Sequence, residues 1–335
     1  MSYFKEYNNT FKSEKSFDWK SEGRIPMMES ILSFLPSKIK EQLNYIPKTI
    51  QQNIEEVRVR INRPIEIITK EKTYYLPYII NTHDSEQLLN KISHHSLYTL
   101  EEELKRGFIT VEGGHRIGLA GKVILENGQV KAIRQISSFN IRLAKEVVGI
   151  GDELVPYLFD KQWQHTMIIG PPQTGKTTLL RDIARIITTG VKEKNIPALK
   201  VGIVDERSEI AGCVNGIPQM TFGVRVDILD ACPKAEGMMM MIRSMSPDVL
   251  VVDEIGRKED SEAILEAMHA GIRLVMTTHG NSFADLKKRP TLQPILEQKV
   301  FDRFIELSRK NGPGTIANIK DKNGMEIVRK VSVRT

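Results

Sequence analysis

The second half of the chain alternates short, continuous apolar runs with longer amphipathic stretches. Apolar runs of this length are typical of strands buried on both faces of a sheet, and parallel strands need crossover helices between them. We therefore predict an α/β domain with a parallel sheet over residues 149–335. Its strands are expected in four runs that end in polar residues: HTMIIG (165–170), KVGIVD (200–205), DVLVVDE (248–254) and RLVMTTH (273–279).

The first half has a different pattern, which predicts a smaller N-terminal α+β domain over residues 28–148. Helical periodicity is expected in 31–46 and 85–105, a strand pair in 56–69, and hairpins in 109–133 with a turn at Asn127-Gly128. The glycines of Gly149-Ile150-Gly151 indicate a hinge between the domains.

The first 27 residues carry scattered aromatic side chains without a clear period. We expect residues 1–27 to form a poorly ordered extension. The regular pattern begins at the pair Met27-Met28, which makes Met28 a candidate for the biological start.

A glycine-rich stretch links the first of these apolar runs to an amphipathic one. The pattern GxxxxGK[ST] is met by Gly170, Gly175, Lys176 and Thr177. Glycines let successive backbone N–H groups point at phosphate oxygens, and the N-terminus of the following helix adds positive potential. Lys176 is expected on the β- and γ-phosphates and the Thr177 hydroxyl on Mg²⁺. The predicted nucleotide-binding residues are Gly170, Pro171, Pro172, Gln173, Thr174, Gly175, Lys176, Thr177 and Thr178.

The run DVLVVDE places two carboxylates at the end of a buried strand. Ligands of open α/β sheets bind outside the carboxyl ends of the strands. We expect Asp253 to hold Mg²⁺ through water and Glu254 to polarise the attacking water.

Two further strand ends carry polar side chains. In VDERSE (204–209), either Asp205 or Glu206 is expected beside the metal-bound water, and the alternative is a solvated loop. The last run delivers His279, which can sense whether the γ-phosphate is present. We include Glu206 and His279 among the catalytic candidates, together with Lys176.

The string IRSMSPDVLVVDEIG (242–256), with VDERSEIAG before it and TTHGNS after it, resembles the secretion and traffic ATPase superfamily. Its members power type II and type IV secretion and pilus assembly, and the nearest resemblance is to a branch from spore-forming bacteria. It covers nearly everything from Met28 to the C-terminus, including TVEGGHRIGLAGK and SSFNIRLAKE in the first domain. One departure is Asp253, since many secretion ATPases have glycine before the Walker B glutamate.

This resemblance implies a RecA-like P-loop core that binds and hydrolyses ATP with Mg²⁺. Gly170–Thr178 corresponds to the Walker A loop, 204–209 to the Asp box, Asp253-Glu254 to Walker B and His279 to the His box. It also implies a hexameric ring, a membrane platform protein as partner, and work as the motor of a secretion-like channel in endospore formation.

Arginines of the first domain are candidates to complete the site. The superfamily presents first-domain arginines to nucleotide, and an arginine finger contributes roughly 10³–10⁵ in rate. The candidates here are Arg116, Arg134 and Arg142, each of which alone is more often a solvated charge. We select Arg142, and predict that Arg142→Ala keeps ATP binding but loses turnover.

The stretch GMMMMIRS (237–244) places four methionines in an expected helix. Methionine fills irregular gaps in cores and also suits adaptable interfaces. A core helix is the favoured interpretation, and a subunit contact is the alternative.

Charge and composition narrow the function further. The formal charge of +6 comes from 48 basic and 42 acidic residues spread along the chain. Because no basic patch is interleaved with aromatic residues, we expect no nucleic-acid partner. The alternative, a RecA-like ATPase acting on RNA or DNA, predicts strongly salt-dependent stimulation. A nucleotide-binding switch could dispense with Glu254, so its presence argues against that third reading.

Cysteine use and hydropathy bear on location. The two cysteines, Cys213 and Cys232, lie outside any CxxC spacing, which favours a reducing interior. No run approaches the roughly 20 apolar residues that span a bilayer. We expect a cytoplasmic protein, peripheral at the membrane on the mother-cell side of sporulating cells.

Overall fold

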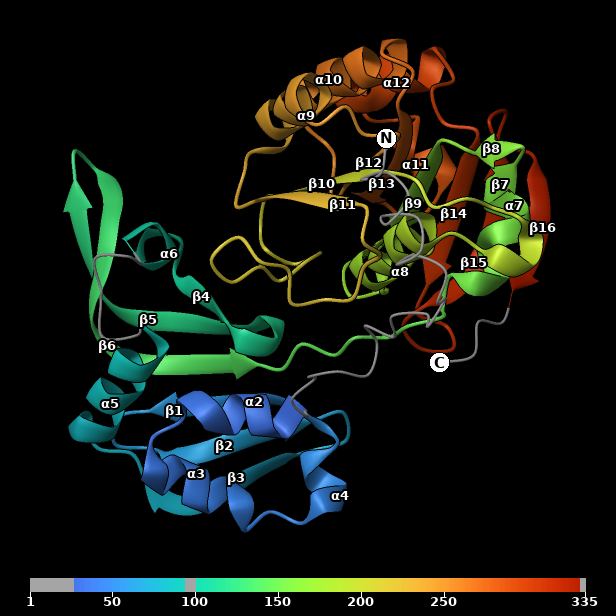
Figure 1. Ribbon diagram of the computed structural model, residues 1–335. Helices are drawn as coiled ribbons and strands as arrows, with labels where there is room; N and C mark the ends of the chain where they lie inside the picture. The colour runs from blue at the N-terminus through green and yellow to red at the C-terminus, as the bar shows by residue number, and fades with distance from the viewer. Residues whose placement is uncertain (1–26, 94–100, 332–335) are drawn as a thin grey trace, which may run out of the picture.

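The computed structural model describes residues 27–93 and 101–331, which contain two large β-sheets joined by a connecting segment (Figure 1). The extension expected over residues 1–27, apart from its last residue, lies outside the described residues. We call the two sheets the N-terminal sheet (β1–β6) and the C-terminal sheet (β9–β16).

The N-terminal sheet is antiparallel, in the order β3-β2-β1-β6-β5-β4. Alternate residues of its inner strands face a core, because successive side chains of a strand point to opposite faces. Val57, Val59, Ile65 and Ile67 are accordingly buried. The strands are β1 (Ile54–Arg60), β2 (Pro64–Thr69), β3 (Thr73–Ile79), β4 (Phe108–Val111), β5 (His115–Glu126) and β6 (Gln129–Arg142).

Short helices supply the other side of this core. Ile31, Ile39 and Leu88 belong to the same buried cluster as the strand residues. The helices are α2 (Met27–Phe34), α3 (Ser37–Asn44), α4 (Lys48–Gln51), α5 (Thr82–Ile92) and α6 (Glu101–Arg106), and η2 (Glu112–Gly114) is a 3-10 turn.

Two helix predictions in this domain are corrected. The stretch 31–46 is split at Pro36, which precedes α3 and cannot supply the N–H that a continuous helix needs. The expected helix 85–105 is replaced by α5, which starts at Thr82 and ends at Ile92, and by α6. The strand pair and the hairpin are confirmed: Asn127 and Gly128 have φ of 51° and 77°, which suits a tight hairpin turn.

The C-terminal sheet has the order β11-β10-β12-β13-β9-β14-β15-β16. Its strands from β11 to β14 are mutually parallel, and β15 and β16 continue it antiparallel. The four predicted strands are confirmed, whereas β11 and β14–β16 had not been predicted. The strands are β9 (Thr166–Gly170), β10 (Val201–Asp205), β11 (Val226–Asp230), β12 (Val249–Val252), β13 (Arg273–His279), β14 (Arg303–Ser308), β15 (Thr315–Asp321) and β16 (Glu326–Val331), with a separate small pair β7 (Phe159–Asp160) and β8 (Gln162–Trp163).

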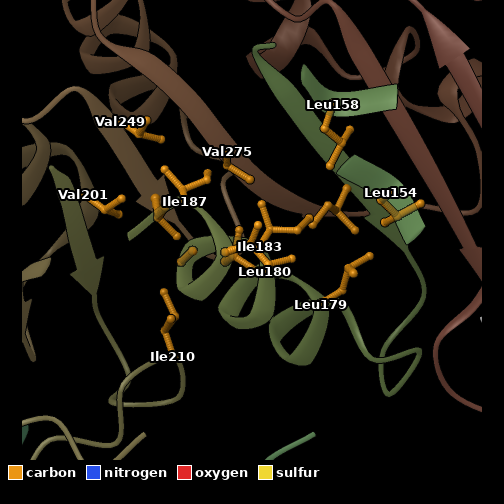
Figure 2. Close-up of a cluster of buried hydrophobic side chains, with 14 of the residues drawn as sticks. Leu154, Leu158, Leu179, Leu180, Ile183, Ile187, Val201, Ile210, Val249 and Val275 are labelled. Carbon is orange, nitrogen blue, oxygen red and sulfur yellow. The ribbon is translucent and has the colours of Figure 1, made fainter. Parts of the chain in front are cut away.

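Helices cover both faces of this sheet. Figure 2 shows Leu180, Ile183 and Ile187 of α8 (Lys176–Thr189) packed toward Val201 and Val249 on one face. On the other face lie α9 (Lys234–Ser244) and α10 (Lys258–His269). The remaining helices are α7 (Val155–Leu158), α11 (Phe283–Leu286) and α12 (Gln293–Glu297), and the 3-10 turns are η3 (Asp152–Leu154), η4 (Lys192–Lys194) and η5 (Pro290–Leu292).

The methionine-rich helix α9 has one buried side and one exposed side. Met238 and Met241 are buried against the sheet, as the core interpretation predicts, while Met240 is 51% exposed. Across the described ranges, none of the helices combines the length and apolar character needed to cross a membrane.

The segment between the sheets, which includes the expected domain boundary, is fastened to the C-terminal domain. The N–H groups of Gly149 and Gly151 donate to the Asp182 carboxylate of α8, at 3.0 and 2.7 Å. The Glu146 carboxylate accepts from the backbone N–H and the hydroxyl of Thr221, at 2.6 and 2.9 Å. The backbone of Gly149 and Gly151, where a hinge was expected, is therefore hydrogen-bonded to α8.

Candidate functional site

One edge of the C-terminal sheet gathers most of the predicted site residues. Because its strands β9–β14 run parallel, their carboxyl ends meet at the same edge. This edge also receives residues from β11 and β14, whose strands had not been predicted. The residues at or directly after the carboxyl ends of these strands are Gly170, Asp205, Asp230, Asp253, His279 and Arg309.

The loop 170–177 makes a tight turn from β9 into α8. Gln173 and Gly175 have φ of 60° and 88°, and Gly175 is the residue before the first turn of α8. A Cβ at Gly170 would lie 2.5 Å from Thr174 Oγ1, so the close approach of the two ends of the loop requires glycine. The N–H of Gly314, the residue before β15, donates to Thr174 O at 2.8 Å and braces the loop. This turn directs the N-terminus of α8 toward the loop, where it favours an anion.

Lys176 is 5% exposed and lies inside this loop. Its Nζ donates to Pro171 O at 3.0 Å and lies 3.2 Å from His279 Nδ1. Burial lowers the pKa of Lys176, while the carboxylates of Asp253 and Glu254 act to raise it. No carboxylate lies within 4.0 Å of Nζ among the residues that the structure describes. The ammonium is thus placed to meet an anionic ligand in the loop.

Asp253 links the loop to the neighbouring strands. Its Oδ2 accepts from the Thr177 hydroxyl at 2.6 Å, and its Oδ1 accepts from the Thr277 hydroxyl. The structure therefore brings the two predicted metal residues together. Carboxylate and hydroxyl oxygens are hard donors that suit Mg²⁺, so Thr177 and Asp253 fit this ion.

Glu254 is held between two basic side chains. His279 Nε2 lies 2.9 Å from its Oε1, and Arg207 donates to its Oε2 at 3.0 Å. Its backbone φ of 53° is unusual for a residue with a side chain, and its N–H donates to Thr277 Oγ1 at 2.8 Å. Such strain is concentrated at functional sites, where the surrounding structure fixes it.

The two acidic residues at the carboxyl end of β10, Asp205 and Glu206, have separate partners. Asp205 is buried, and its carboxylate accepts from the backbone N–H groups of Glu209, Ile210 and Ala211, each at 2.9 Å. Burial raises the pKa of Asp205 to about 6, against the lowering effect of these N–H groups. Glu206 instead accepts from Lys234 Nζ at 2.5 Å.

Glu206 faces the same hollow as the other carboxylates. Although burial acts to raise the pKa of Glu206, the hydrogen bond and charge of Lys234 lower it overall. A hollow of about 10 Å³ is lined by four carboxylates and three further residues: Asp205, Glu206, Asp253 and Glu254, with Arg207, Glu209 and Lys234. This is close to the volume that one water molecule needs.

The first-domain arginines are distributed differently from the prediction. Arg116 forms an ion pair with Glu209 of the 204–209 loop, and its guanidinium carbon lies 3.6 Å from the centre of the Phe108 ring. Arg142 pairs with Glu56 of its own sheet at 3.3 Å. Arg134 lies opposite Lys122 in the β5–β6 hairpin. Within this subunit, only Arg116 of the three reaches a predicted site element.

Three basic residues of the edge were missed as site candidates. Arg207 and Lys234 hold Glu254 and Glu206, as described above, and Arg309 NH2 donates to Pro172 O and lies 3.3 Å from Gln173 Oε1. Arg207 lies within the motif VDERSE (204–209), directly after the predicted Glu206. The signal for Arg309 was the run FIELS (304–308) directly before it, which ends a parallel strand as the four predicted runs do.

Comparisons with known proteins agree with this architecture. The model of the family "Sporulation stage III, protein AA" matches residues 27–327. The chain is 56% identical to stage III sporulation protein AA of Bacillus subtilis (strain 168) over 308 residues, which cover 92% of this chain and 100% of that protein.

Among solved structures, the chain resembles the Legionella pneumophila ATPase DotB, with a TM-score of 0.54 and 16% identity over 81% of this chain and 76% of the other. It also resembles the pilus retraction motor PilT with bound ADP, with a TM-score of 0.55 and 16% identity over 82% and 77%. These likenesses confirm the predicted fold, a RecA-like α/β core with a smaller α+β domain before it. By the family match and the identity to its Bacillus relative, the chain belongs to the sporulation stage III protein AA family.

Proposed function

We propose that the chain is an ATPase that hydrolyses ATP to ADP and phosphate with Mg²⁺. One observation carries this proposal: the Thr177 hydroxyl and Asp253 meet at 2.6 Å beside Lys176, and Glu254 lines the adjoining hollow. This arrangement combines a phosphate loop, a hard metal-ligand pair and a carboxylate next to space for one water.

Each residue has a distinct task in this proposal. The backbone N–H groups of Gly170–Thr178 cradle the phosphates, and Lys176 exchanges its contact with Pro171 O for the β- and γ-phosphate oxygens. Thr177 and Asp253 hold Mg²⁺, which neutralises charge on the phosphate oxygens when it is bound.

Glu254 orients the attacking water and accepts its proton. His279 connects this group to the phosphate side, since its two ring nitrogens lie 3.2 Å from Lys176 and 2.9 Å from Glu254. A γ-phosphate that draws Lys176 away therefore changes the contacts of His279, which is how His279 senses the nucleotide. Glu206, fixed by Lys234, borders the water from the other side.

The test is to measure phosphate release and ATP binding for the full chain. Glu254→Gln is expected to keep ATP binding and to lose about 10²–10⁴ in turnover, the usual contribution of a positioned general base. Lys176→Ala is expected to lose ATP binding. Glu297→Gln, an exposed change on α12, serves as the control. Unchanged turnover in Glu254→Gln would remove this residue from the site.

We further propose that the protein works as a hexameric motor on a membrane platform protein of the sporulation channel, at the mother-cell side of the membrane. The family membership and the secretion-ATPase fold support this role. ATP binding would close the first domain onto the core, and hydrolysis would release it. A fluorescent fusion in sporulating cells tests the location; a signal spread evenly through the cytoplasm contradicts it.

In such a ring, Arg142 is proposed to reach the nucleotide of a neighbouring subunit. Its side chain is 59% exposed and its pair with Glu56 is a weak surface contact. Arg142→Ala and Glu254→Gln should each abolish turnover alone, while a mixture of both variants regains activity, because mixed interfaces combine an intact arginine with an intact glutamate. Arg134→Ala is the matched control. A mixture that stays inactive argues against a shared site.

The same assay separates this proposal from an ATPase that acts on RNA or DNA. We expect the rate to be unchanged by either nucleic acid. A rate that rises only with nucleic acid, and falls steeply with salt, would favour the alternative.

A further inference from the structure

A groove of about 950 Å³ lies between α9 and α10. The two helices pack side by side on one face of the C-terminal sheet, and Figure 1 shows them at the top of this domain. Ala235, Met239, Met240 and Ala263 supply its apolar lining. None of these side chains takes part in the site described above.

The floor of the groove is unusual for an exposed surface. Met238 and Met241 are at most 1% exposed, so their side of α9 packs in the core. Met240, on the other side, is 51% exposed. Methionine is flexible and polarisable, and is over-used on surfaces that adapt to a partner. The core therefore explains only part of the methionine cluster.

The rim of the groove is acidic. Glu236 of α9 and Glu259, Glu262 and Glu266 of α10 line it, against the single basic residue Arg243 in this lining. Glu262 forms an ion pair with Lys258 at 3.6 Å. No ion pair within 4.0 Å involves the other three glutamates anywhere in the described ranges.

The spacing of the glutamates on α10 brings like charges close together. Glu262 follows Glu259 by three residues and precedes Glu266 by four, so all three lie on one stripe of α10. Like charges at this spacing repel and destabilise a helix. A cationic partner along the stripe would relieve this repulsion.

We propose that the α9–α10 groove binds an amphipathic helix of a partner protein, with an apolar stripe on the methionine floor and Lys or Arg side chains toward the glutamate rim. Since α9 has 11 residues, the groove accommodates about 16 Å of helix, or about three turns. Helix-in-groove recognition uses anchors at positions i, i+3, i+4 and i+7, which fit this length. The inference is independent of ATP hydrolysis.

The test uses the full chain and a fluorescent helical peptide as probe. The peptide carries Leu at i, i+3, i+4 and i+7 and Lys along both flanks, and its binding is followed by fluorescence anisotropy. Saturable binding is expected, with Kd at least tenfold higher for Met240→Glu, which places a charge on the floor. Met325→Glu is the matched control, because Met325 is equally a surface methionine (68% exposed) but lies before β16.

The charge preference is tested separately. A peptide with Glu in place of every Lys should bind at least tenfold more weakly to the native chain, and the double change Glu259→Lys with Glu266→Lys should reverse this preference. Thermal melting checks that the variants fold as the native chain does.

Three results would overturn the proposal. They are the absence of saturable binding to the native chain, binding that Met240→Glu leaves unchanged, and equal binding of the two peptides. Concentration-dependent self-association that is lost in Met240→Glu would instead assign the groove to a second copy of this chain.

Discussion

The dipeptide Asp-Glu occurs at the carboxyl ends of two neighbouring strands, and the two aspartates have different kinds of partner. β10 and β12 pair in parallel, with Val204 beside Val252, so Asp205 and Asp253 follow at adjacent positions of one edge. Asp205 turns to three backbone N–H groups of its own loop, while Asp253 turns to hydroxyls of α8 and β13. The first aspartate closes a loop, and the second connects separate elements.

Because the residue type is the same, only the hydrogen-bond partners distinguish the carboxylate that we interpret as structural from the one that we propose as a metal ligand. A carboxylate whose acceptor positions are filled by local N–H groups has little left for a ligand. One that contacts a hydroxyl can exchange this contact for a metal ion without leaving a buried donor of the main chain unpaired.

The largest effect is expected from Asp253→Asn. Under the proposed function Asp253 holds Mg²⁺, so loss of its charge should remove several kcal/mol of transition-state stabilisation and lower ATP turnover about 100-fold or more. Thermal stability should change little. Asp248→Asn, at the other end of the same strand, is the control, since its carboxylate accepts from the backbone N–H of Lys200. Turnover that survives Asp253→Asn would show that hydrolysis does not need the Asp253 carboxylate, and would contradict the contrast with Asp205.

Asp205→Asn is expected to act on stability. The asparagine side chain has one acceptor oxygen, whereas the Asp205 carboxylate has two. Its NH₂ group would face backbone N–H groups of the loop, which are themselves donors. The cost is about 2 kcal/mol, measured from the denaturant dependence of unfolding. Asp227→Asn, on the neighbouring strand β11, should cost much less. Native stability with lost turnover would instead place Asp205 in the chemistry.

These two sites also mark how far sequence alone can predict. The loop 170–177 and the Asp253-Glu254 pair were predicted because their signals are local: a fixed spacing of glycines and a continuous apolar run. The same applies to the β5–β6 turn at Asn127-Gly128. Both Asp205 and Glu206 line the hollow. The sequence pattern could not tell which of them is held by backbone N–H groups and which by Lys234, because that depends on how the 206–209 loop folds.

Long-range contacts account for the rest. Strand β11 has no fully buried residue, and β16 lies at the outer edge of the sheet, so neither has the continuous apolar run that marked the inner strands. Lys234 and Glu206 are 28 residues apart, and Arg116 and Glu209 are 93 apart. Nothing in a local pattern specifies such pairs. Arg142 was selected from family resemblance, and its role stays a prediction that the mixing experiment tests.

A smaller effect is expected where the first domain contacts the 204–209 loop. Arg116→Ala removes a partly exposed ion pair with Glu209, worth about 1 kcal/mol or less. Hydrogen exchange at the amides of Ile210 and Ala211 should accelerate less than about fivefold, because Asp205 still holds them, whereas Asp205→Asn should accelerate it far more. Arg134→Ala is the control. Equal acceleration in both variants would show that the domain contact, and not Asp205, closes the loop.

The smallest effect is expected from the pH dependence of Glu206. Lys234 lowers the pKa of Glu206 below its ordinary 4.5, so the ionised pair stabilises the fold above pH 4.5, and this contribution is lost as the pH falls through the lowered value. Glu206→Gln should therefore cost about 1 kcal/mol or less near pH 7, and this difference from the native chain should shrink below pH 4.5. Denaturant unfolding across this range measures it, with Glu297→Gln as the control. A difference that grows on acidification would mean that Glu206 is held as the neutral acid, and the two strand ends would then differ in protonation as well as in partners.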